Sequence, residues 1–328
     1  MYLGVDGGGT KTAYALIDAG GRLHATHYAG SVSHLSGGVA AATALLHEGI
    51  RTLLAKGNLR PADVSFAYFG LPSYGEDSAT TAQLDAMPSP LFDAAKYRCG
   101  NDMICSWAGS LACRDGVSVI AGTGSMAYGE YAARCARAGG WGELIGDEGS
   151  AYWLAREGMN LFSRMSDGRA ARGPLYELVR ARLGLDIDLD LCARVYGESV
   201  NTRAAFAQFA PLVDAAAQAG DGQARTIFAR AADELAVTVG AVRRALAVPG
   251  DVVLPVSYSG GAFSGSALLL SFFRDALADA ALPSECPPPL FPPLIGAALY
   301  AARLAGSGLP EAPLTTLREH CAARGLPP

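Results

Sequence analysis

Glycines and small polar residues follow two apolar segments of the chain in a similar order. Near the N-terminus they form "DGGGTKT", and in the second hundred residues they form "AGTGS". A glycine turn between two strands can bring successive backbone N–H groups close to an anion, because no Cβ blocks the approach. We therefore expect both turns to bind phosphate, through Gly8, Gly9, Thr10, Lys11, Thr12, Gly122, Thr123, Gly124 and Ser125.

A third glycine turn, "VSYSGGAF", follows another apolar segment and places Gly260 and Gly261 where they could pass close to an adenine or ribose. Each turn alone could be an ordinary glycine-rich hairpin. The chain lacks the Walker pattern GxxxxGK[ST], and the first turn does not complete GxGxxG. The ordered set of three turns favours a nucleotide site.

Two acidic residues lie where phosphoryl transfer would need them. Asp6 ends the first expected strand and can hold the Mg²⁺ that accompanies a nucleotide, directly or through water. Asp102 lies where a strand leads into a helix. Phosphoryl transfer depends mainly on positioning and charge neutralisation, so a carboxylate beside the acceptor hydroxyl suffices as a base. Because "ND" is also a good helix start, the alternative role for Asp102 is that of a helix N-cap.

The segment "GGWGELIGDEGSAYW" contains a possible sugar site. A carboxylate such as Asp147 accepts hydrogen bonds from paired hydroxyls, and the face of Trp141 can cover the apolar C–H side of a sugar ring. The alternatives are a tryptophan in the core and an acid that only favours a helix N-terminus.

The elements that must position these residues alternate between strands and helices. The first hundred residues predict the order β-β-β-α-β-α-β-α, beginning with a three-stranded meander over 2–30. Two strands then surround the second glycine turn, which suggests a duplication. Alanine-rich helices follow residue 149, and a strand at 251–261 precedes three further helices. The pattern predicts an α/β fold.

Size and composition exclude several classes of function. With 328 residues the chain is long enough for two domains, and its formal net charge of -5 argues against a nucleic-acid partner. No run approaches the roughly 18 apolar residues of a membrane-spanning helix. Seven scattered cysteines without a C-x-x-C pattern suit reduced thiols, so we expect a cytoplasmic protein without a cysteine metal site.

The order of these motifs, with "ND" before a helix and "SGG" before another, resembles the N-acetylglucosamine kinase branch of the BadF/BadG/BcrA/BcrD ATPase family. This family is part of the sugar kinase, actin and heat-shock ATPase superfamily. The resemblance implies two ribonuclease H-like, actin-like ATPase domains that close over ATP-Mg in a central cleft between the lobes. It also implies ATP-dependent phosphorylation of an amino sugar, N-acetylglucosamine or glucosamine, at its 6-hydroxyl.

The resemblance also assigns roles residue by residue. It makes Asp6 the magnesium-linked acid and Asp102 the catalytic acid that faces the sugar hydroxyl. It makes the first and second glycine turns the two phosphate loops, and the third glycine turn the adenosine loop. The sugar-binding positions are Ser33, Asp102, Thr123, Trp141 and Asp147. Ser33 departs from the family, which commonly has an asparagine there; a hydroxyl reaches less far than an amide, so the choice between an N-acetylated and a free amine stays open.

The expected domains are 1–105, joined by a C-terminal helix at 310–328, and 106–309. We expect a small-molecule sugar as substrate and a homodimer as the assembly. Two alternatives have similar phosphate loops. One is a dehydratase-activating ATPase, which would need cysteines converging on an iron–sulfur cluster. The other is a nucleotide-switched binding protein like actin or a chaperone.

Overall fold

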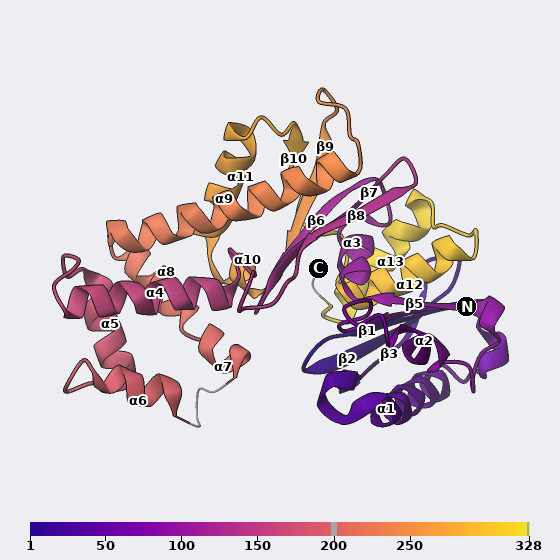
Figure 1. Ribbon diagram of the computed structural model, residues 1–328. Coiled ribbons are helices and arrows are strands. Elements are labelled where there is room, and N and C mark those ends of the chain that lie inside the picture. The colour runs from indigo at the N-terminus through magenta and orange to yellow at the C-terminus, as the bar shows by residue number, and fades with distance from the viewer. Residues whose placement is uncertain (198–201, 327) are drawn as a thin grey trace. The chain divides into compact units, whose positions relative to one another are not determined.

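The computed structural model describes residues 1–197, 202–326 and 328. Contacts divide the chain into two compact units (Figure 1), one formed by Met1–Asp115 with Pro288–Pro328 and the other by Gly116–Pro287. The two units differ from the boundaries expected from the sequence. Helices α3 (Met103–Leu111) and α12 (Pro293–Leu304) belong to the first unit, because α12 packs on both α3 and β1 (Tyr2–Gly7).

The first unit contains a five-stranded sheet in the order β3-β2-β1-β4-β5. Strands β1, β2 and β3 form the predicted antiparallel meander, while β4 pairs with β1, and β5 with β4, in parallel. The remaining strands of this sheet are β2 (Lys11–Ile17), β3 (Leu23–Gly30), β4 (Phe66–Leu71) and β5 (Tyr97–Asn101). The carboxyl ends of the parallel strands β1, β4 and β5 therefore lie along one edge.

Helices cover both faces of this sheet, which is why its strands are apolar on both sides. Leu3 and Val5 pack with α1 (His34–Lys56), whereas Tyr2 packs with α12 and α13 (Glu311–Ala323). The C-terminal helix α13 contacts β3, where His320 Nδ1 accepts a hydrogen bond from Leu23 N–H at 3.1 Å. The short elements of this unit are α2 (Thr81–Ala86) and the 3₁₀ turns Pro61–Asp63 and Ala94–Lys96.

The second unit has a sheet of the same design, in the order β10-β9-β6-β7-β8. An antiparallel meander, β6-β7-β8, is again extended by parallel strands on the side of its first strand. The strands are β6 (Gly116–Ala121), β7 (Ser125–Tyr131), β8 (Arg134–Gly139), β9 (Leu254–Ser259) and β10 (Ser284–Glu285). The prediction omitted β8, because "RCARAG" forms a largely exposed edge strand without apolar alternation. Two like sheets confirm the predicted mixed α/β fold.

Helices of the second unit share one large core with its sheet. The longest, α9 (Gly222–Ala245), packs on β6, β7 and β8. The alanine-rich segment 206–219 predicts a single helix, but the structure has two there, because Pro211 lies in the first turn of the second one, where a missing N–H is tolerated. The other helices are α4 (Ala151–Ser166), α5 (Pro174–Leu183), α6 (Asp190–Tyr196), α7 (Arg203–Ala207), α8 (Ala210–Gln218), α10 (Gly261–Gly265) and α11 (Ala267–Asp279).

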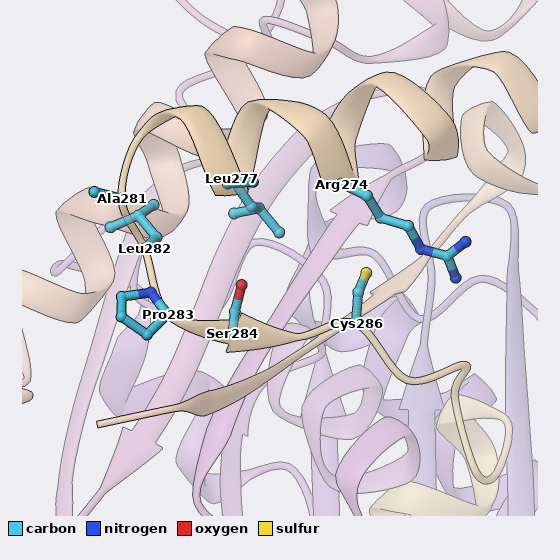
Figure 2. Close-up of a pocket in the computed structure, with 8 residues that line it drawn as sticks. Arg274, Leu277, Ala281, Leu282, Pro283, Ser284 and Cys286 are labelled. Atoms are coloured by element: carbon cyan, nitrogen blue, oxygen red, sulfur yellow. The ribbon is translucent and has the colours of Figure 1, made fainter. Parts of the chain in front are cut away.

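A cavity of about 580 Å³ lies between α11 and β10, where Figure 2 shows Arg274 and Cys286 on facing elements. Strand β10 pairs with the beginning of β9 at Leu254 and Pro255. The glycine turn at Gly260 follows the other end of β9. This cavity is therefore separate from the candidate site. In the described ranges, no helix has the length and apolar character that crossing a bilayer would require.

Candidate active site

The first glycine turn joins β1 to β2 and is closed by its own backbone. Gly8 N–H donates to Lys11 O at 2.9 Å, while Gly9, Thr10 and Lys11 are exposed. Thr12 is fully buried, and its Oγ1 accepts a hydrogen bond from Val32 N–H at 3.0 Å. The turn therefore presents Gly9, Thr10 and Lys11 to solvent, and Thr12 holds the following loop.

The loop between β3 and α1 is bound to this turn by hydroxyl groups. Ser31 Oγ donates to Gly8 O at 2.7 Å and accepts from Ser33 N–H at 3.1 Å. Ser33 directly precedes α1, yet its side chain caps no described N–H of that helix. The structure thus links the Ser33 backbone to the first glycine turn through Ser31, and the Ser33 hydroxyl has no capping role.

Asp6 lies at the end of β1, opposite Gly70 of β4 in the sheet register. Burial raises the pKa of its carboxyl to about 7, against the smaller opposing effects of the Cys105 thiol and the Lys11 ammonium. Few neighbouring groups thus stabilise the negative charge of this carboxylate. It is a suitable ligand for a cation, since Mg²⁺ prefers oxygen donors.

Asp102 directly precedes α3, but the side chain that accepts a hydrogen bond from the start of the helix is that of Asn101. Asn101 Oδ1 accepts from Met103 N–H at 3.0 Å, and Asn101 Nδ2 donates to Tyr74 O at 3.1 Å. The Asp102 side chain makes no capping hydrogen bond within the described chain. Burial, followed by the nearby charge of Asp6, raises the pKa of Asp102 to about 8. Smaller effects of its own N–H and of the Met103 N–H lower the pKa, so the start of the helix holds this carboxyl only weakly.

Gly70 allows the two acidic residues to share one environment. A Cβ added to Gly70 would collide with Cys105 Sγ and would lie 3.2 Å from both Asp102 Cα and Val5 O. Cys105 is completely buried, and both Asp6 and Asp102 contribute to raising the pKa of its thiol. The carboxyl ends of β1, β4 and β5 thus bring Asp6 and Asp102 close to each other.

In the second unit, the second and third glycine turns are neighbours. Strands β6 and β9 run parallel, with Ile120 opposite Ser259, so the turns that follow them leave the same edge of the sheet. Gly260 has a φ of 100°, and a Cβ placed there would lie 2.5 Å from Ala121 O and 2.8 Å from Gly122 N. The structure therefore places Gly122–Ser125 beside Gly260 and Gly261, the arrangement that a shared nucleotide site requires.

Helix α4 begins directly against the second turn. Ala151 N–H donates to Gly122 O at 2.9 Å, and Gly122 N–H donates to Gly124 O at 2.9 Å. Ser125 Oγ donates to Glu148 O at 2.6 Å. These bonds fix the turn between β6 and β7 against the start of α4.

Asp147 and Trp141, predicted as a pair in the sugar pocket, have opposite environments. Asp147 is 2% exposed; its Oδ1 accepts from Ser125 N–H at 3.1 Å, and its Oδ2 pairs with Arg203. Burial raises the pKa of Asp147, while Ser125 and Arg203 oppose that shift. Trp141 is 71% exposed. Asp147 therefore supports the second turn from inside, and Trp141 offers its ring to solvent.

A model of the BadF/BadG/BcrA/BcrD ATPase family matches residues 3–301. The chain belongs to this family. The match covers all three glycine turns together with Asp6 and Asp102, as the resemblance of the motifs implied.

Two curated proteins and one solved structure are similar to this BadF/BadG/BcrA/BcrD family member. N-acetyl-D-glucosamine kinase of Dictyostelium discoideum is 26% identical over 92% of this chain and 97% of its own. N-acetylmuramic acid/N-acetylglucosamine kinase of Clostridium acetobutylicum is 33% identical over 54% and 58%. A crystal structure from Chromobacterium violaceum, provisionally described as an N-acetylglucosamine kinase, is 27% identical with a TM-score of 0.68 and covers 92% of this chain and 98% of that one.

Sequence reasoning missed Arg203, which contacts Asp147 from a position 56 residues further along the chain. Arg203 is the first residue of the short helix α7, and an arginine there belongs to no motif, so only the folded arrangement reveals this pair.

Proposed function

We propose that this chain phosphorylates an amino sugar, N-acetylglucosamine or glucosamine, at its 6-hydroxyl with ATP as the donor. Support comes from the family, and from two relatives named as N-acetylglucosamine kinases that align with nearly the whole chain. The observation that carries the proposal is that Asn101 caps α3 while the Asp102 carboxyl, beside Asp6, is left for chemistry.

Asp102 is the proposed catalytic residue. In its ionised form it orients the sugar hydroxyl and accepts its proton as the oxygen attacks the γ-phosphoryl group. A carboxyl group with a pKa near 8 is a stronger base than an ordinary aspartate once it is ionised. Since phosphoryl transfer needs little covalent help, this positioning and proton acceptance are the main tasks of the protein at the acceptor.

ATP is proposed to bind through the three glycine turns of both units, with Gly9, Thr10 and Lys11 at one part of the triphosphate and Gly122–Ser125 at another. Gly260 and Gly261, which lie beside the second turn, are assigned to the adenosine. A closed arrangement of both units around one nucleotide stays a prediction, and a crystal structure with bound Mg-ADP would test it.

Asp6 is proposed to hold Mg²⁺. Its carboxyl group fits this role. The pKa of about 7 indicates that neighbouring groups stabilise the ionised form only weakly, and a divalent cation would supply the positive charge that does so. In the described part of the chain, no three acidic, histidine or cysteine side chains form a metal cluster. Mg²⁺ bound with a nucleotide needs only one or two carboxylates. When bound, the ion would neutralise charge on the phosphates.

Sugar binding is proposed for Ser33, Thr123, Trp141 and Asp147 together with Asp102. Trp141 supports this assignment, since its exposed ring is free to stack on the apolar face of a sugar. Ser33 supports it because its backbone is linked to the first turn through Ser31 and its hydroxyl does not cap α1. A cytoplasmic homodimer stays a prediction, and light scattering after size-exclusion chromatography would test the dimer.

The test is a coupled assay of ADP release with glucosamine, N-acetylglucosamine, N-acetylmannosamine, N-acetylmuramic acid and glucose. We expect strong turnover with one of the first two sugars, and nuclear magnetic resonance of the product should show a phosphate on the 6-oxygen. ATP hydrolysis that is indifferent to every sugar would contradict the proposal and favour a nucleotide-switched protein.

A further inference from the structure

Arg203 lies against the second glycine turn although it comes from a separate helix. A Cβ added to Gly124 would collide with Arg203 Nη2 and would lie 2.8 Å from Asp147 Oδ1. The guanidinium and the carboxylate therefore pack directly on the backbone of Gly124. The Arg203 side chain is 35% exposed, so it is close to solvent on the side of the turn.

Two acidic residues contact this guanidinium, so its positive charge lies beside the turn. Nη2 pairs with Asp147 Oδ2, and Nε lies 3.4 Å from Glu143 Oε2. The charges of Glu143 and Glu148 both act to raise the pKa of Asp147, and Arg203 acts to lower it. Without Arg203, Asp147 would be a buried carboxylate that accepts a hydrogen bond from Ser125 N–H and has no adjacent positive charge from the described residues to balance it.

Helix α7 holds Arg203 in this position through packing on α4. The rings of Phe206 and Tyr152 have centroids 5.2 Å apart, and those of Phe206 and Phe209 are 5.7 Å apart. Thr202 Oγ1 accepts a hydrogen bond from Ala205 N–H at 3.1 Å and so caps the helix. Tyr152 lies near the start of α4, next to the loop that contains Asp147, which explains how α7 reaches the turn.

These contacts create a conflict that Arg203 resolves. Asp147 must accept the Ser125 N–H to fix the turn, yet a buried negative charge behind a phosphate-binding turn repels the ligand. We infer that Arg203 is a positioning residue for nucleotide binding: it neutralises Asp147, so that this carboxylate can hold the second turn without opposing the phosphates. The inference rests on the proposed function and adds a residue to its nucleotide site.

The test is the affinity of Mg-ADP, measured by calorimetry in the absence of sugar. Arg203→Ala should weaken binding by about 10-fold, and Arg203→Lys should restore part of the loss because it keeps the charge. Asp147→Asn removes the charge but keeps an oxygen that can accept from Ser125. In the Arg203→Ala/Asp147→Asn double variant, affinity should therefore return to within about 3-fold of the wild type.

Arg180→Ala is the matched control, since Arg180 pairs with Asp188 in the same unit, on α5. It should leave Mg-ADP affinity unchanged. Equal affinity in the wild type and Arg203→Ala would overturn the inference, and so would a double variant that binds as weakly as Arg203→Ala. If Arg203→Ala does not fold, Arg203→Gln with Asp147→Asn removes both charges at similar volume and must still bind Mg-ADP. A wild type that binds no Mg-ADP would instead contradict the proposed function.

Discussion

The side-chain oxygen of Asn101 accepts the backbone N–H of Met103 at 3.0 Å and thereby caps α3 in place of Asp102. Two adjacent residues with nearly the same shape thus have separate tasks. Asn101 closes the helix and holds Tyr74 O, while the acidic neighbour keeps its carboxyl beside Asp6. The separation matters because a carboxylate that caps a helix is stabilised in its ionised form by N–H donors and becomes a weaker base.

Asp102→Ala should therefore lower kcat by roughly 10²-fold or more while Mg-ADP affinity stays close to that of the wild type. The helix keeps its cap in this variant, so the loss can be assigned to the carboxyl group. Steady-state kinetics with the preferred sugar, together with calorimetry for Mg-ADP, measure the two quantities. Full turnover in Asp102→Ala would remove this residue from the catalytic role.

The raised pKa of Asp102 also predicts how stability depends on pH in the ligand-free, magnesium-free protein. The pKa of this carboxyl group is about 8 in the folded chain, whereas it is 3.8 when the group is exposed. Between these values the folded state binds more protons than the unfolded state, so this group's contribution to stability is present at low pH and is lost as pH rises toward 8. Asp102→Asn removes that dependence.

Thermal unfolding of the wild type and Asp102→Asn, measured from pH 5 to pH 8.5, checks this sign. The difference in Tm should move in favour of Asp102→Asn as pH rises, by roughly 2–4 °C for each 1 kcal/mol involved. Asp77→Asn, in an exposed turn, is the control and should show a Tm difference that is flat over this range. A constant difference for Asp102→Asn would mean that the group titrates normally.

The Mg²⁺ assignment of Asp6 predicts a different kinetic signature. Asp6→Asn should raise the Mg²⁺ concentration needed for half-maximal activity by about 10-fold, because a neutral amide is a poorer ligand for a hard divalent cation. The KM for the sugar should change much less. Titration of activity with Mg²⁺ at fixed ATP measures the effect, and an unchanged titration curve would contradict the assignment.

The sequence predicted those parts of the molecule whose signals are local. Strand–turn–strand patterns around "DGGGTKT" and "AGTGS" predicted the first meander and the first two strands of the second one, since apolar runs and glycines act over a few residues. The membership of α12 in the first unit was beyond such signals. The apolar residues of α12 predict that the helix is buried, but they do not indicate in which core. In the structure that core includes β1, which is far away in sequence.

The same distinction between local and long-range signals holds for the residues of the candidate site. Short motifs identify the chemistry of some site residues, so the sequence could predict Asp6, Asp102 and the glycine turns. The folded arrangement decides the rest: the Asn101 side chain caps α3, where the sequence suggested a cap role for Asp102, and Arg203 contacts Asp147 across 56 positions. Asp147 was placed in the sugar pocket on chemistry alone, and only the fold reveals that both of its oxygens are engaged inside the second unit.

A comparison of two glycines in the second turn tests whether the packing behind it matters. At Gly124 a Cβ would lie 2.8 Å from Asp147 Oδ1 and would collide with the Arg203 guanidinium, whereas at Gly122 the space around a Cβ is open. Neither residue has a φ in the left-handed region, so backbone strain does not distinguish them. Gly124→Ala should lower the free energy of unfolding by about 1–3 kcal/mol, since both charged groups must shift.

Gly122→Ala should change the free energy of unfolding by less than about 1 kcal/mol, because alanine meets no steric conflict there and loses less entropy on folding. Urea denaturation of both variants measures this contrast. Mg-ADP affinity of Gly124→Ala should fall together with its stability, because the displaced Arg203 no longer compensates Asp147. Equal stability of the two variants would show that the guanidinium can move away at little cost, and that the second turn does not depend on its packing.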